Sequence, residues 1–137
     1  MDIDLARLRT FFAAAPFMAD LGIEPFECDP GRIATQLVLQ PRHHQHSGVV
    51  HAGVMGAMAD HTMGAAAQTM TEQLILTAEF KLSLLRAARG QRLECRGVVL
   101  KPGRLVMFTE AEVFVLDGSA RTLVAKASAT MAVTAPA

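Results

Sequence analysis

The chain has 137 residues, a length that suits one domain with a single hydrophobic core. Hydrophobic residues make up 51% and charged residues 19% of it, which is typical of a folded protein and excludes a disordered one. Thirteen basic residues balance thirteen acidic residues, so a broad nucleic-acid-binding surface is excluded and no nucleic-acid partner is expected.

The two cysteines, Cys28 and Cys95, are too few for a disulfide framework or a zinc site, which favours a reducing, cytoplasmic location. The first four residues carry acids where a secretory signal carries lysine or arginine. No stretch is long and apolar enough to cross a membrane as an uninterrupted helix, so no membrane partner is expected. Residues 52–67 come nearest, but Asp60 interrupts them.

A helical segment is predicted at the N-terminus. Apolar residues recur at helical spacing from Ile3 to Ala15, which indicates an amphipathic helix that ends near Pro16. A further turn of helix is expected around residues 17–21, before a glycine. Residues 1–22 are therefore assigned to an N-terminal helical segment of the domain.

A pair of strands and a long helix are predicted next. Residues 23–28 and 32–39 are interpreted as strands because the strong turn signal Asp29-Pro30-Gly31 separates them. A polar, histidine-rich loop follows over residues 40–50. Residues 52–69 are rich in alanine and methionine, which favour helix, and are apolar nearly all round. We therefore expect this central helix to be buried.

Four long strands are predicted in the second half of the chain. Apolar and polar side chains alternate over residues 74–85, and residues 91–100, 104–116 and 120–133 behave similarly. Short glycine-containing turns separate them, as in hairpins. The order of elements predicts an α+β fold in which a curved antiparallel sheet wraps around one long central helix, in a single domain over residues 1–137.

Asp60 is the most informative residue of the predicted central helix, because its neighbours are almost all Ala, Met, Gly and Val. Burial of an unpaired carboxylate is costly or raises its pKa, and a chain tolerates it more readily where the carboxylate has a chemical role. Gly56 and Gly64 lie four residues to either side on the same helix face, where they should open a slot on both sides of the carboxylate. An exposed aspartate, with glycines that serve helix packing, is the alternative.

The N-terminus of the central helix is the second candidate feature. Gly48, His51 and Gly53 bring a flexible turn into it. From Ala52 onward, free backbone N–H groups carry partial positive charge and can hold an oxyanion. Ala52 and Asp60 are eight residues apart on one helix, about 12 Å, so they cannot serve the same site. A two-fold dimer with antiparallel helices would bring Asp60 of one subunit close to Ala52 of the other. A site that uses both residues would therefore be shared between subunits.

Residues 45–60 resemble the motif of the PaaI-type hotdog thioesterases, which has an amide residue, a glycine, His-Gly-Gly and an acid nine residues after the histidine. The matching residues are Gln45, Gly48, His51, Ala52, Gly53 and Asp60. The similarity continues through residues 77–88 and the predicted sheet, so it covers nearly the whole chain. It implies the hotdog fold and hydrolysis of an acyl-CoA, with no metal or redox cofactor and with coenzyme A as part of the substrate. It also implies a homo-oligomer, with a dimer as the minimal active unit and a tetramer as the expected assembly.

The resemblance assigns catalytic roles to four residues. Asp60 serves as general base or nucleophile toward the thioester, and the backbone N–H of Ala52 polarises the thioester carbonyl. Gln45 helps to hold water or the thioester, and Thr77, on the first long strand, can position water. The acid and the amide come from opposite subunits. Ala52 stands where the family usually has glycine, which places a methyl group beside the carbonyl site.

Coenzyme A carries phosphates, which need cationic partners near the site. The candidate substrate-binding residues are the loop residues Gly48, His51 and Gly53 and the basic residues Arg86, Arg89, Lys101 and Arg104. The basic residues fall at the ends of the predicted strands, near the region where the resemblance places the nucleotide. Solvated charges at turns explain each of them equally well when it is taken singly.

Other interpretations stay open on the sequence. Four histidines fall between residues 43 and 51, yet their spacing fits no ligand pattern, so no metal site is expected. His46 or His61 could act as a general base in place of Asp60. A hotdog enoyl-CoA hydratase or dehydratase would need a histidine paired with an acid in a different arrangement. A non-catalytic acyl-CoA-binding or regulatory module would bind its ligand without releasing free thiol.

Overall fold

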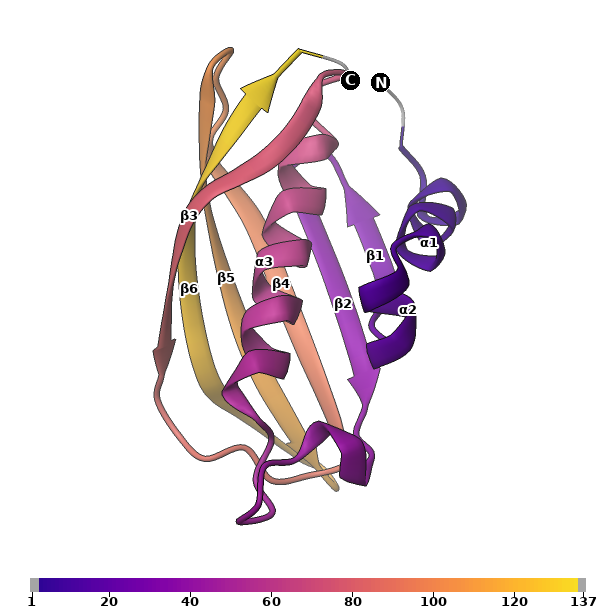
Figure 1. The fold of residues 1–137 in the computed structure, drawn as a ribbon, viewed down its shortest axis with the longest axis vertical. Helices are drawn as coiled ribbons and strands as arrows, with labels where there is room; N and C mark the ends of the chain where they lie inside the picture. Colours follow the sequence, from indigo (N-terminus) through magenta and orange to yellow (C-terminus); the bar gives the residue numbers. More distant parts are fainter. Residues whose placement is uncertain (1–2, 136–137) are drawn as a thin grey trace.

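One antiparallel sheet curves around one long helix in the computed structural model, which describes residues 3–135 (Figure 1). The strand order is β1-β2-β4-β5-β6-β3, and each neighbouring pair is antiparallel. The elements are α1 (Leu5–Ala14), α2 (Pro16–Leu21), β1 (Glu24–Asp29), β2 (Arg32–Val38), the 3-10 helix η1 (Pro41–His43), α3 (Ala52–Gln68), β3 (Leu74–Leu84), β4 (Arg92–Lys101), β5 (Val106–Asp117) and β6 (Ala120–Thr134). This arrangement confirms the predicted fold class.

The two N-terminal helices begin and end at residues that cap them. The Asp4 side chain accepts a hydrogen bond of 2.8 Å from the backbone N–H of Arg7 and so caps the start of α1. Pro16 separates the helices and is the first residue of α2, because proline lacks an N–H but fits the first helical turn. Gly22 ends α2 in the left-handed conformation, with φ of +90°. These ends agree with the helical segment predicted from the sequence.

The central helix α3 lies in the hollow of the sheet (Figure 1). The side chains of Met58, Ala59 and Met63 are fully buried between the helix and the strands. Gly97 on β4 lets the two backbones approach closely, since a Cβ there would lie 3.1 Å from the carbonyl oxygen of Thr62. No helix within residues 3–135 is long and apolar enough to span a membrane.

A small polar network lies under α3. The hydroxyls of Thr35 and Thr62 are 2.8 Å apart, and Thr62 also donates to the carbonyl oxygen of Met58 at 2.6 Å. Burial raises the pKa of the neighbouring Cys95 thiol to about 12. Cys95 is therefore a protonated core residue and not a nucleophile at neutral pH.

The predicted loop over residues 40–50 contains a turn of 3-10 helix, η1, that the sequence does not reveal. Its anchor is the buried ring of His43, whose Nδ1 accepts from the backbone N–H of Gln40 at 3.0 Å and whose Nε2 lies 2.8 Å from the carbonyl oxygen of Leu21. The backbone N–H of His51 donates to the carbonyl oxygen of His43 at 2.9 Å. This turn therefore ties the start of α3 to the end of α2.

The strand β3 forms one edge of the sheet and pairs only with β6 within residues 3–135. Leu76, Phe80 and Leu84 on this strand are 53%, 42% and 52% exposed. A long edge strand with exposed apolar side chains tends to pair with another chain.

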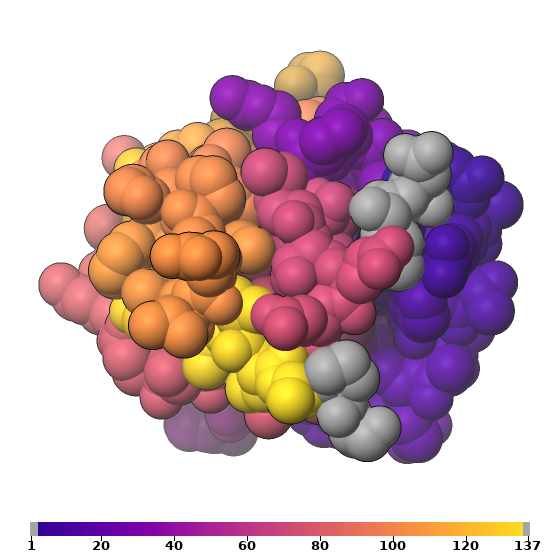
Figure 2. All heavy atoms as spheres, turned by 90° about the horizontal axis from the view of Figure 1, so that it is seen from above, coloured from indigo at the N-terminus to yellow at the C-terminus, as the bar shows by residue number. Residues whose placement is uncertain are grey.

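Figure 2 views the end of the molecule at which β4 turns into β5 and the chain leads from α3 into β3. In this view the turn between β4 and β5 lies at the left and the N-terminal helices lie at the right.

Candidate active site

The Asp60 carboxylate lies on α3 and is half-buried. The hydroxyl of Thr77 on β3 donates to its Oδ1 at 2.6 Å and also lies 3.5 Å from Sδ of Met131. The pairing of β3 with β6 shifts register between Thr77 and Glu79, where a β-bulge re-aims the strand. Two elements therefore position the carboxylate: α3 carries it and the bulged edge strand holds one of its oxygens.

The two glycines that flank Asp60 have different surroundings. A Cβ added at Gly64 would meet no heavy atom of residues 3–135 within 4 Å, so this side is open. A Cβ added at Gly56 would lie 3.6 Å from Leu82 and 3.8 Å from the ring of Phe80, both on β3. The predicted slot on both sides of the carboxylate is therefore wrong on the Gly56 side, because edge-strand side chains fill that space.

A cavity of about 610 Å³ adjoins Asp60 between α1, α3 and the start of β3, and we call it the acid cavity. Its apolar wall consists mainly of Leu8, Phe11, Phe12, Leu74, Ile75 and Leu76. Gly64 opens into it, and Thr77 forms part of the same wall. The sequence predicts the amphipathic character of the first helix but not that its phenylalanines line a cavity with Asp60.

His61 also lines the acid cavity. Its ring meets that of Phe12 edge-on, with the centroids 4.6 Å apart and the planes at 89°. Burial lowers the pKa of His61, and the negative charge of Asp60 opposes that shift. The imidazole is therefore neutral at pH 7. Within residues 3–135 no hydrogen bond joins it to the carboxylate of Asp60.

A second cavity, of about 550 Å³, lies at the N-terminus of α3, and we call it the helix-start cavity. It brings together the predicted site residues Gln45, His51, Ala52 and Arg86, with His46 beside them. The acid cavity contains Asp60 and Thr77 instead. The structure of one protomer thus divides the predicted catalytic residues between two separate cavities.

The backbone N–H groups at the start of α3 are not equivalent. Nδ1 of His51 accepts from the N–H of Gly53 at 2.8 Å, and the carbonyl oxygen of His51 accepts from the N–H of Val54 at 3.0 Å. The N–H of Ala52 makes no hydrogen bond within residues 3–135. His51, predicted from the sequence as a substrate-binding loop residue, therefore caps the helix and leaves the Ala52 donor free to bind an anionic oxygen.

A tight loop holds Gln45 beside the helix start. Its backbone N–H donates to the carbonyl oxygen of Val49 at 2.8 Å, and its carbonyl oxygen accepts from Gly48 at 3.0 Å. Gly48 has φ of +83°, a conformation that favours glycine. The side-chain oxygen of Gln45 accepts from the N–H of Ser47 at 2.5 Å, which orients the amide group.

The four predicted basic residues form two pairs at opposite ends of the sheet. Arg86 lines the helix-start cavity and donates to the carbonyl oxygen of Leu123 at 3.1 Å, and Arg89 lies next to Gly48. Lys101 ends β4, and Arg104 lies in the turn before β5, at the other end of the strands (Figure 1). One protomer therefore does not bring all four to a common phosphate-binding site.

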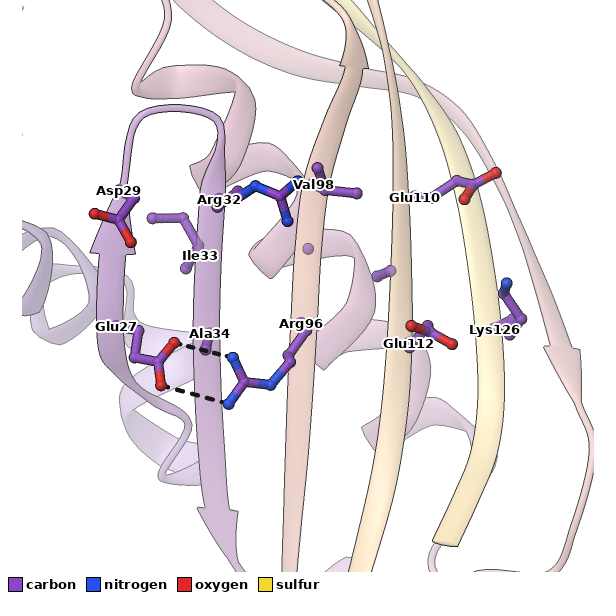
Figure 3. A pocket seen from close by; sticks show the side chains of 12 residues that line it. Glu27, Asp29, Arg32, Ile33, Ala34, Arg96, Val98, Glu110, Glu112 and Lys126 are labelled. Atoms are coloured by element: carbon purple, nitrogen blue, oxygen red, sulfur yellow. Dashed lines mark hydrogen bonds and ion pairs between the residues drawn. The ribbon is translucent and has the colours of Figure 1, made fainter. Parts of the chain in front are cut away.

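A third hollow, of about 240 Å³, lies on the sheet face turned away from α3 and contains none of the predicted site residues (Figure 3). Its side chains carry charges of both signs, and Arg96 pairs with Glu27 at 2.9 Å across it. Such pairs are typical of a solvated sheet face. Among the described residues, no group of three or more His, Cys, Asp or Glu side chains is placed to hold a metal ion.

The curved antiparallel sheet wrapped around one central helix is the hotdog fold. Residues 47–122 match the sequence model of the thioesterase superfamily. The chain belongs to this superfamily, which confirms the prediction of a thioester hydrolase.

Solved structures similar to the chain agree with this assignment. A thioesterase family protein from Silicibacter pomeroyi is 30% identical, with a TM-score of 0.92 over 96% of this chain and 99% of that chain. A conserved protein from Pseudomonas aeruginosa is 28% identical, with a TM-score of 0.80 over 88% and 94%. A phenylacetic acid degradation-related protein from Ralstonia eutropha is also 28% identical, with a TM-score of 0.78 over 87% and 90%. These similarities confirm the PaaI-type resemblance, whereas no curated protein matches the sequence.

Proposed function

We propose that the protein hydrolyses an acyl-CoA or aryl-CoA thioester to the free acid and coenzyme A, with Asp60 as its catalytic carboxylate. The observation that supports this most directly is the position of Asp60 in the wall of an apolar cavity, with Thr77 bonded to Oδ1 at 2.6 Å. The hydrogen bond orients the carboxylate, so its second oxygen is presented in a defined direction. An apolar cavity next to an oriented carboxylate suits a thioester with an apolar acyl group.

The reaction follows either of two routes from the same geometry. Asp60 takes a proton from water, which adds to the thioester carbonyl carbon, or Asp60 adds to that carbon itself and forms an anhydride that water then hydrolyses. In both routes the carbon–sulfur bond breaks and coenzyme A leaves as a thiolate that takes up a proton. The N–H of Ala52 stabilises the oxyanion. Gln45 and Thr77 orient the water.

The active unit in this proposal is a dimer. Asp60 and Ala52 line different cavities of one protomer and are about 12 Å apart along α3. Antiparallel pairing of two β3 edges would place two copies of α3 side by side in opposite directions. Each acid cavity would then face the helix start of the other subunit, and exposed Phe80 and Leu84 would be covered. Association of two dimers into a tetramer stays a prediction.

Coenzyme A in this arrangement leaves through the helix-start cavity. Gln45 and Arg86 line that cavity, and Arg89 lies beside its loop, so two guanidinium groups are available to phosphate oxygens at this end. Lys101 and Arg104 lie at the far end of the same protomer. The cytoplasmic location and the lack of a cofactor stay predictions of the sequence.

Complementation between two inactive variants tests the shared site. Asp60→Asn removes the acid, and Ala52→Pro removes one N–H at the first helical position, where proline is tolerated. His51, with φ of −63° and ψ of 136°, already has the conformation required before proline. Each variant alone should show little thiol release from a panel of acyl-CoA thioesters.

Co-expression of the two variants should restore hydrolysis. With random pairing, half of the dimers are mixed and each mixed dimer has one intact site, so about a quarter of the wild-type activity is expected. Two differently tagged copies of Asp60→Asn, co-expressed in the same way, are the control and should stay inactive. Purified mixed dimers without activity would contradict the shared site, and near-normal activity of Asp60→Asn alone would remove Asp60 from its role.

A further inference from the structure

The acid cavity has the position and size of a pocket for the acyl group. Asp60 forms part of its wall, so a thioester carbonyl that reaches this carboxylate has the cavity as adjoining space. Its volume of about 610 Å³ lies within the usual range of small-molecule pockets, about 300–1,000 Å³. The wall is formed by aliphatic and aromatic side chains of α1 and β3, such as Leu8, Phe11 and Ile75. These groups offer dispersion contacts and exclude water from an apolar chain or ring.

The charges around the acid cavity have one sign. Among the described residues that line it, Asp60 and Glu72 are the charged ones, and both are acidic. His61 adds no positive charge at neutral pH, because its burial lowers the pKa of the imidazole. An acyl group that ends in a carboxylate would bring a third negative charge into this space, and no cationic side chain is among the described residues that line it. Such an unpaired charge is strongly disfavoured in an apolar pocket.

Gly64 lies on the open side of the acid cavity. It follows Asp60 by one helical turn on the same face of α3, so it lies next to the path of an acyl group that extends from the carboxylate. A Cβ at this position would have open space within 4 Å, whereas the corresponding space at Gly56 is filled by Phe80 and Leu82. Any side chain longer than alanine at position 64 would therefore reduce the volume available to the substrate.

We propose that the acid cavity binds the acyl group, that it selects neutral, apolar acyl groups over acyl groups with a terminal carboxylate, and that Gly64 sets the size of group it accepts. The inference rests on the proposed thioesterase function and specifies the substrate class of that same site. Gly64 and Glu72 act here on substrate selection, and neither takes part in the chemical step.

The chain-length profile of the wild-type protein tests the apolar part of this proposal. For straight-chain acyl-CoA thioesters from acetyl upward, kcat/KM should rise about fourfold per added methylene until the cavity is full. Glutaryl-CoA should react more slowly than the uncharged valeryl-CoA of matching length by a factor on the order of 100. Equal rates for these two thioesters would overturn the charge selection. A profile that is flat from acetyl to octanoyl would overturn the assignment of the cavity.

Substitutions at Gly64 test the size limit. Gly64→Leu should lower the ratio of kcat/KM for the best long-chain substrate to kcat/KM for acetyl-CoA by roughly 10- to 100-fold. Gly64→Ala is the matched control, since its single methyl group fits the open space and should change the profile little. An unchanged chain-length optimum in Gly64→Leu would refute the role of Gly64. If that variant does not fold, Gly64→Val serves with the same expected direction.

The charge at the cavity is tested separately through Glu72, which is exposed. Glu72→Gln should raise the ratio of kcat/KM for glutaryl-CoA to kcat/KM for valeryl-CoA several-fold, and Glu72→Arg should raise this ratio more. No change of this ratio in Glu72→Arg would contradict the charge selection. If the wild type hydrolyses no acyl-CoA, the proposed thioesterase function and the proposed acyl selection both fail. If it hydrolyses acyl-CoA thioesters with dependence on Asp60, but the Gly64 and Glu72 variants keep the wild-type substrate profile, only the acyl selection fails.

Discussion

The hydroxyl of Thr77 on the edge strand β3 donates to the carboxylate of Asp60 on the central helix at 2.6 Å. The bulge that follows Thr77 in β3 fixes the direction of this hydroxyl, so the candidate acid and the strand edge are linked. Any change that shifts β3, including its pairing with a second subunit, therefore also acts on the orientation of the carboxylate.

Removal of the Thr77 hydroxyl should weaken catalysis without much effect on folding. We expect Thr77→Val to lower kcat by roughly 10- to 100-fold, because a hydrogen bond to a charged group is lost. Thr77→Ser keeps the donor and should retain most of the activity. Steady-state hydrolysis of one acyl-CoA by the three proteins, with thermal unfolding as a check, measures the effect. A loss of activity in Thr77→Ser without one in Thr77→Val would show that the methyl group, and not the hydroxyl, matters.

Asp60→Asn should lower kcat by a factor on the order of 10² to 10⁴, the usual contribution of a general base, with little change in the midpoint of thermal unfolding. The amide keeps the shape of the side chain, and its oxygen can still accept from Thr77. The experiment is a thiol-release assay at saturating acyl-CoA. Activity close to wild type would transfer the catalytic role to another group, with His61 in the same cavity as the first to examine.

The sequence predicts the sheet and α3 well because both have strong local signals. Alternation of polarity over ten or more residues identifies each long strand, and the alanine- and methionine-rich composition identifies the helix. The structure places these elements within a few residues of the predicted limits. The predicted loop fails at η1, because its stability comes from the contact of His43 with Leu21, a residue 22 positions earlier. No local pattern contains that information.

The candidate site is only partly visible in the sequence for the same reason. Residues 45–60 form a continuous motif, so Gln45, Ala52 and Asp60 can be selected directly. The acid cavity, however, depends on how α1 and β3 pack against α3. That packing brings Phe12 to His61 and fills the Gly56 side with Phe80, and neither contact follows from spacing along the chain.

The His51 cap should contribute measurably to stability. His51→Ala removes the acceptor of the Gly53 N–H and should lower the free energy of unfolding by about 0.5–2 kcal/mol. His51→Asn supplies another capping side chain and should restore most of the loss. Urea unfolding of the three proteins measures it. Equal stability of His51→Ala and wild type would show that water replaces the cap.

A companion variant tests the same contact from the other side. A Cβ at Gly53 would lie 2.9 Å from Nδ1 of the His51 ring, so Gly53→Ala should push the ring away. Although alanine favours helix over glycine by about 1 kcal/mol, we expect Gly53→Ala to gain less than this or to lose stability. A full gain would show that the ring moves without cost.

A charge on the β3 edge should separate the subunits. Phe80→Glu places a carboxylate on a strand whose apolar side chains are exposed in one protomer, and burial of that charge at a strand pair is unfavourable. We expect a monomer in light scattering and little hydrolysis, although every proposed catalytic residue is unchanged. Phe80→Leu is the matched control and should stay associated and active. A fully active monomeric Phe80→Glu protein would contradict the shared site.

The stability of the protein should fall on mild acidification because of His61. Burial holds its pKa below the usual value of 6.5, so between these two values the unfolded chain binds a proton that the folded chain does not. The contribution of neutral His61 to the free energy of unfolding is therefore fully present above about pH 6.5. It is lost as the pH falls toward the lower pKa that His61 has in the folded state. Urea unfolding at pH 7.5 and 5.5 should show a smaller difference for His61→Gln than for wild type. Burial also lowers the pKa of His43, so His43→Gln should likewise reduce the difference in the free energy of unfolding between pH 7.5 and 5.5. If both variants keep the pH dependence of the wild type, groups other than these two histidines cause it.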